Sequence, residues 1–128
     1  MEELLYKELS GKIIAAAYKV YNTLGAGFLE KVYENALLYE LRKQGINVES
    51  QVSINVYYED MVVGAYFADI IVEDLIIVEL KAITELAASH EVQLINYLKA
   101  TKKKVGLLIN FGDKITIRRK IMEKKMNK

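Results

Sequence analysis

The segment "LIIVELK", residues 75–81, decides the fold. It is short and almost wholly apolar, which is typical of a central strand covered on both faces. Yet it ends with Glu79 and Lys81, which are two residues apart and therefore lie on the same face of a strand. The segment predicts a buried strand that carries a polar site at its carboxyl end.

The elements around this strand follow from hydrophobic periodicity and from turn residues. Helices are predicted over 3–23, 28–44 and 88–101, and further strands over 52–58, 61–72, 104–111 and 114–120. Three strands in a row indicate a meander, and the helix between two buried strands indicates a right-handed crossover that joins parallel neighbours. The order α-α-β-β-β-α-β-β therefore predicts an α/β fold with a mixed β-sheet flanked by helices.

Length and composition restrict the class of protein. The 128 residues, 52% of them hydrophobic, predict a single domain over 1–128 with a packed core. No cysteine is present, so any metal must be held by oxygen or imidazole. The acidic start "MEELLYKELS" does not resemble a secretion signal, and no apolar stretch reaches about 18 residues. We therefore expect a cytoplasmic protein with no membrane partner. The sequence leaves open whether it forms a homo-oligomer.

The charges are distributed unevenly along the chain. Residues 1–101 contain 8 basic and 15 acidic side chains, a balance of −7, whereas residues 102–128 contain 10 basic and 2 acidic ones, a balance of +8. The basic C-terminal tail, about 118–128, can contact phosphates or can be an ordinary solvated terminus. Both interpretations stay open at this point.

A second carboxylate interrupts the preceding strand, as Asp69 in "YFADIIV". If the two strands form a hairpin centred on Asp74, paired residue numbers sum to 148 and Asp69 lies opposite Glu79. Two carboxylates at this range repel each other unless a divalent cation lies between them. A two-residue turn would instead place Glu79 on the other face. The alternative for Glu79 and Lys81 is a solvated or ion-paired strand end.

The predicted helices also carry polar residues toward their buried sides. In the helix over 88–101, His90, Gln93 and Tyr97 fall within a strip about 60° wide, next to apolar residues. In the helix over 28–44, Glu30 lies at the border of the apolar face and Glu40 lies within it. Glu40 is expected to cap a buried donor or to support a site, and His90 can equally be an ordinary structural histidine.

Taken in order, these residues resemble a known family. "GFLEKVY" fits G-x-x-E-x-x-Y, and downstream come Asp69, the E-x-K of Glu79 and Lys81, and the Q-x-x-x-Y of Gln93 and Tyr97. The set is similar to the GxxExxY family within the PD-(D/E)XK nuclease superfamily, over nearly the whole chain. The family pattern has histidine, proline and a basic residue where this chain has Tyr21, Ala26 and Phe67.

The resemblance implies a restriction-endonuclease-like core and a role for each site residue. Asp69 and Glu79 are the implied ligands of Mg²⁺ or Mn²⁺, together with the backbone carbonyl of Leu80 and with Glu30, directly or through water. Lys81 is implied to orient the attacking water.

Gln93 and Tyr97 are implied to close the site and to contact substrate. The resulting hypothesis is a metal-dependent nuclease whose substrate is nucleic acid, with DNA the expected form. Two alternatives are a catalytically silent nucleic-acid-binding or scaffold protein with the same fold, and a structural domain whose carboxylates form only ion pairs.

Overall fold

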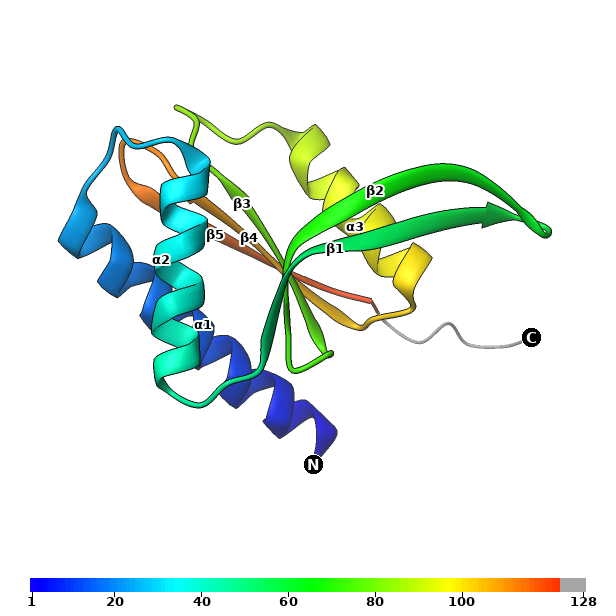
Figure 1. The fold of residues 1–128 in the computed structure, drawn as a ribbon, viewed down its shortest axis with the longest axis horizontal. Coiled ribbons are helices and arrows are strands. Elements are labelled where there is room, and N and C mark those ends of the chain that lie inside the picture. Colours follow the sequence, from blue (N-terminus) through cyan, green and yellow to red (C-terminus); the bar gives the residue numbers. More distant parts are fainter. Residues whose placement is uncertain (123–128) are drawn as a thin grey trace.

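The computed structural model describes residues 1–122, which form a five-stranded mixed sheet with helices on both faces (Figure 1). In chain order the elements are α1 (Glu2–Leu24), α2 (Glu30–Lys43), β1 (Val48–Tyr58), β2 (Met61–Val72), β3 (Ile76–Lys81), α3 (Ala88–Thr101), β4 (Val105–Phe111) and β5 (Ile115–Ile121). The strands lie side by side in sequence order. Only the β3–β4 pair is parallel among the described strands, and α3 makes the connection between them. The predicted α/β fold, its mixed sheet and its crossover helix are confirmed.

Strand β3 lies in the middle of the sheet and is covered from both sides, as its composition predicts. Ile76, Val78 and Leu80 pack into the core formed with α1 and α2. Ile77 faces the other way, into the core formed with α3. All of these side chains are fully buried. The two cores thus hold the strand that carries the polar residues, and its carboxyl end is fixed in position.

The turn between β2 and β3 confirms the predicted register. Ile70 pairs with Val78 and Val72 pairs with Ile76, so paired numbers sum to 148. The loop of residues 73–75 is odd in length and is centred on Asp74. Glu73 and Asp74 both adopt left-handed backbone conformations, with φ of 53° and 57°. This turn places Asp69 and Glu79 opposite each other, just beyond the last ladder pair.

The outer parts of β1 and β2 form a two-stranded arm, residues 52–67, that projects past the rest of the sheet (Figure 1). The arm begins where the side chains of β2 switch from one face of the sheet to the other. Ala68 belongs to the core beneath α3, whereas Ile70, two residues later, belongs to the opposite core. Opposite Asp69 on β1, Gln51 has a φ of 51°. The strand pair therefore twists sharply at Gln51 and Asp69, and the arm packs against α3.

The basic tail expected from residue 118 onward begins inside β5. Arg118 and Lys120 pair with Glu91 of α3, so this part of the tail belongs to the sheet. Residues 123–128 lie outside the described residues. Across residues 1–122, no helix is long and apolar enough to cross a membrane.

The contact between α3 and β4 allows a direct test of this packing. A Cβ added at Gly106 would lie 2.8 Å from a terminal carbon of Leu94, which is fully buried. We expect Gly106→Ala to lower the free energy of unfolding by about 1–3 kcal/mol through overpacking. Gly11 of α1 is the control, since no atom lies within 4 Å of an added Cβ there. Gly11→Ala should raise stability by roughly 0.5–1 kcal/mol through helix propensity. Urea unfolding measures both, and equal effects would contradict the packing.

Candidate active site

The site is built where β2 and β3 stop pairing. Beyond the Ile70–Val78 pair, Glu79 Oε1 accepts a hydrogen bond from the backbone N–H of Asp69 at 2.9 Å. In the other direction, Asp69 Oδ2 accepts one from the backbone N–H of Leu80 at 2.8 Å. The two carboxylates thus take backbone donors that a continuing ladder would pair with carbonyls. We call the point where β2 and β3 separate, at Asp69 and Glu79, the fork. The crossed pair of hydrogen bonds holds the two strands together there.

Burial at the fork destabilises the charged form of its carboxylates. Glu79 is 7% exposed, and desolvation raises its pKa to about 8, with the charge of Asp69 adding to the rise and that of Lys81 opposing it. Burial also raises the pKa of Asp69. Within residues 1–122, Asp69, Glu79 and Lys81 form no ion pair.

Glu30, the first residue of α2, approaches the fork from the side covered by α1 and α2. Its pKa is raised first by burial and then by the charge of Asp69, while Lys81 acts in the opposite direction. The structure therefore brings Glu30 into electrostatic contact with the other predicted residues. In the described part of the chain, however, no three carboxylate or imidazole side chains are already arranged as ligands of one ion. The crossed hydrogen bonds explain this in part, since they occupy one oxygen of Asp69 and one of Glu79.

The loop before α2 explains the rest of the G-x-x-E-x-x-Y motif. Tyr33 is fully buried and stacks on Phe111 with ring centres 4.5 Å apart. Its hydroxyl donates to the carbonyl of Gly25 at 2.6 Å and accepts the N–H of Phe28 at 3.2 Å. Gly27 has a φ of 109°, a conformation that favours glycine. These contacts fix the start of α2 and thereby position Glu30.

Two residues that were not predicted join the site. Glu34, one turn after Glu30, is only 2% exposed and accepts hydrogen bonds from Lys31 and Gln51, each at 3.2 Å. Gln51 also lies 3.3 Å from Asp69 Oδ1. Its amide therefore bridges the carboxylates of Glu34 and Asp69. The spacing of four between Glu30 and Glu34 was the available signal, because residues at i and i+4 share a helix face.

The role expected for Glu40 needs a correction. It neither caps a buried donor nor supports the site. Its carboxylate lies 3.1 Å from Lys19 Nζ of α1 and 3.4 Å from Lys43 Nζ. Lys19 accordingly lowers the pKa of Glu40. Glu40 thus pairs with cations on the outer side of the two helices.

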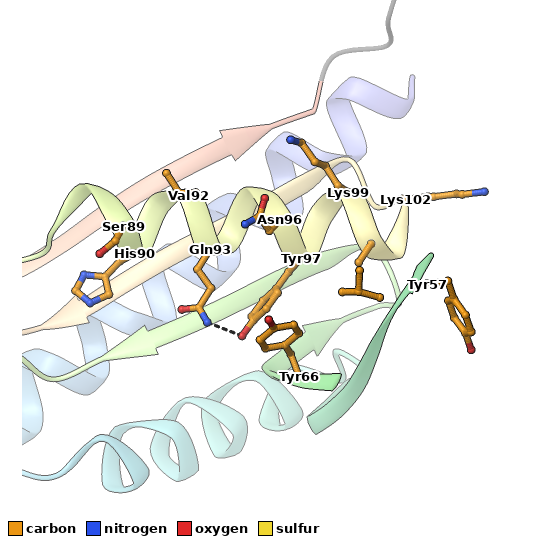
Figure 2. Close-up of a pocket in the computed structure, with 12 residues that line it drawn as sticks. Tyr57, Tyr66, Ser89, His90, Val92, Gln93, Asn96, Tyr97, Lys99 and Lys102 are labelled. Carbon is orange, nitrogen blue, oxygen red and sulfur yellow. Dashed lines mark hydrogen bonds between the residues drawn. The ribbon is translucent and has the colours of Figure 1, made fainter. Parts of the chain in front are cut away.

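Helix α3 covers the fork from the opposite side. Gln93 Nε2 donates to the hydroxyl of Tyr97 at 2.9 Å (Figure 2). Burial raises the pKa of that hydroxyl, and the charges of Glu79 and Asp69 raise it further, so the Tyr97 hydroxyl lies within electrostatic range of both carboxylates. His90 lies at the start of the helix, where Nδ1 accepts the N–H of Ala87 at 2.9 Å. Tyr97 thus lies near the fork with Gln93 bonded to it, and His90 caps the helix.

Comparisons with known proteins identify the family and the fold. The family model described as "PD-(D/E)XK nuclease superfamily" matches residues 7–123. The crystal structure of SSO0001 is similar in fold, with a TM-score of 0.52 at 20% sequence identity. The similarity covers 96% of this chain and 61% of that one, so this chain spans less than two thirds of SSO0001. A search of curated proteins finds no match.

The pKa of Glu79 predicts how stability depends on pH in metal-free buffer. Below about pH 4.5 the side chain is protonated in both folded and unfolded states. Between 4.5 and about 8 the unfolded chain releases this proton while the folded protein keeps it. The free energy of unfolding should therefore fall as the pH rises through this window, by at most about 1.4 kcal/mol per unit.

Urea unfolding at pH 5, 6, 7 and 8 measures this slope. Glu79→Gln should flatten it, because the amide does not titrate, although Asp69 and Glu30 leave part of the slope in place. Glu40→Gln is the control on α2, since the pKa of Glu40 is lowered rather than raised. Parallel slopes for the wild type and Glu79→Gln would contradict the assignment.

Proposed function

The chain belongs to the PD-(D/E)XK nuclease superfamily, and from this membership we propose that it is a metal-dependent nuclease whose fork hydrolyses phosphodiester bonds. Nucleic acid is the proposed substrate, with DNA the expected form, and the motif order supports a place within the GxxExxY family. One observation carries the proposal: the buried Glu79 and the partly buried Asp69 hold each other's strand by crossed hydrogen bonds at the fork, and neither forms an ion pair within residues 1–122.

The donor set suits Mg²⁺ or Mn²⁺. Both ions prefer hard oxygen ligands, and Asp69 and Glu79 each keep one oxygen that the crossed hydrogen bonds do not use. Glu30 and the backbone carbonyl of Leu80 complete the proposed ligands. Burial is the main cause that raises the pKa values of Glu30, Asp69 and Glu79, and a divalent cation would stabilise the charged form of each carboxylate. Binding requires these side chains to move toward one another, because they do not yet form a ligand set.

When bound, the cation would supply an activated water and neutralise charge on the phosphate. The chain's own residues do the rest. The Lys81 ammonium holds the attacking water in line with the phosphorus and stabilises the developing negative charge. Gln93 and Tyr97 are hydrogen-bond donors on the far side of the fork and hold a phosphate oxygen or a water. Gln51 positions Asp69 by its contact with Oδ1.

A binding measurement and a cleavage measurement test the proposal separately. Asp69→Asn and Glu79→Gln should weaken Mn²⁺ binding at least about 10-fold by calorimetry, because each removes a charged ligand. Lys81→Ala should leave Mn²⁺ binding close to that of the wild type. It should nevertheless slow cleavage of labelled DNA by about 100-fold or more, because the water loses its orienting group.

Glu30→Gln and Glu40→Gln form a matched pair on one helix. Only Glu30→Gln should reduce Mn²⁺ affinity, since Glu40 pairs with Lys19 away from the fork. Mn²⁺ binding without cleavage of single- or double-stranded DNA would favour the catalytically silent alternative. Absence of Mn²⁺ binding by the wild type would reject the metal-dependent site altogether.

A further inference from the structure

A cleft of about 930 Å³ opens between α3 and the β1–β2 arm, beside the fork (Figure 2). Twelve of the described residues line it: Val56, Tyr57, Tyr66, Ser89, His90, Val92, Gln93, Asn96, Tyr97, Lys99, Ala100 and Lys102. Gln93 and Tyr97 belong to both the cleft and the proposed active site. The cleft is therefore continuous with the side chains that face Asp69 and Glu79, and a molecule lying in it would reach the fork.

Tyrosine rings are the first distinctive feature of the lining. Tyr66 of β2 and Tyr97 of α3 lie with ring centres 5.6 Å apart and their planes tilted by 46°. Tyr57 stands on the arm, 61% exposed, toward the carboxyl end of α3 (Figure 2). The rings are thus distributed from the fork to the outer end of the cleft. Aromatic faces at such positions suit flat, unpaired bases, which stack on them without regard to sequence.

Charge is the second feature. Among residues 1–122, the lining contains Lys99 and Lys102 and no carboxylate, although residues 1–101 carry a balance of −7. His90 adds a donor, because its Nδ1 accepts the N–H of Ala87 and the proton of the neutral ring is therefore on Nε2. The described lining thus carries only positive formal charge, which suits the phosphates of a nucleic acid strand.

We propose that this cleft binds single-stranded DNA and delivers it to the fork. The inference rests on the proposed nuclease function and names its substrate class. Bases stack on Tyr57, Tyr66 and Tyr97, while the phosphates lie toward Lys99 and Lys102. A paired base has both faces covered by its neighbours, so a duplex cannot offer its bases to these rings. Unpaired ends, flaps and loops are thus the DNA forms that the site selects.

Fluorescence anisotropy of labelled DNA tests the proposal in EDTA, where cleavage cannot interfere. An oligothymidylate of about 20 nucleotides should bind at least 10-fold more tightly than a blunt duplex of equal length. Tyr57→Ala should weaken binding of the single strand by about 5- to 100-fold, and Tyr57→Phe should restore it because the ring remains. Tyr58→Ala is the matched control, since Tyr58 is the next residue on the same strand, is 68% exposed and does not line the cleft.

The salt dependence gives a second readout. Lys99→Ala should reduce the slope of log affinity against log salt by about 0.7, the value for one phosphate contact on a single strand. Lys12→Ala, on α1 and outside the cleft, should leave that slope unchanged. Equal affinity for the duplex, or equal loss from Tyr57→Ala and Tyr58→Ala, would overturn the proposal. If the protein binds single strands but cleaves no DNA, the cleft proposal stands and the nuclease proposal fails. Failure of one proposal can therefore be told from failure of the other.

Discussion

The crossed hydrogen bonds between Asp69 and Glu79 are the interaction on which the site depends. Each carboxylate satisfies a backbone N–H at the place where β2 and β3 separate, and each keeps a second oxygen for other partners. Without them, the N–H groups of Asp69 and Leu80 would lose their partners in a part-buried environment, at a cost of about 1–3 kcal/mol each. The same two side chains therefore maintain the fork and supply the negative charge for the proposed chemistry.

The fork also explains how residues from opposite faces of a sheet meet. A continuous sheet would separate α2 from α3 by a layer of backbone. Here the pairing of β2 with β3 ends at Ile70 and Val78, and the arm twists away at Gln51 and Asp69. Charges therefore interact across the opening: in addition to burial, which is the larger cause, the charge of Asp69 raises the pKa of Glu30 on one side and of Tyr97 on the other. Because of this opening, side chains from both faces of the sheet can contribute to one site.

Much of this arrangement could be predicted from the sequence, for a definite physical reason. Strand residues alternate between faces, so the register of one hairpin places Asp69 and Glu79 once the turn length is chosen. Glu34 and Gln51 could not be found in this way, because their contact depends on how α2 lies over β1. Glu40 was misplaced for a related reason. Its angular position on the helix was known, but the packing of α1 that brings Lys19 to it was not.

The two sides of the fork differ in charge, and this difference suits them to different roles. The α2 side brings Glu30 and the buried Glu34 toward Asp69, which concentrates negative charge where a cation would lie. The α3 side brings Tyr97 and, further out, basic side chains in a cleft whose described lining has no carboxylate. An anionic polymer is repelled by the first side and attracted by the second. Substrate should therefore approach along α3, and the metal should be held from α2, so that phosphate and cation meet at Glu79 from opposite directions.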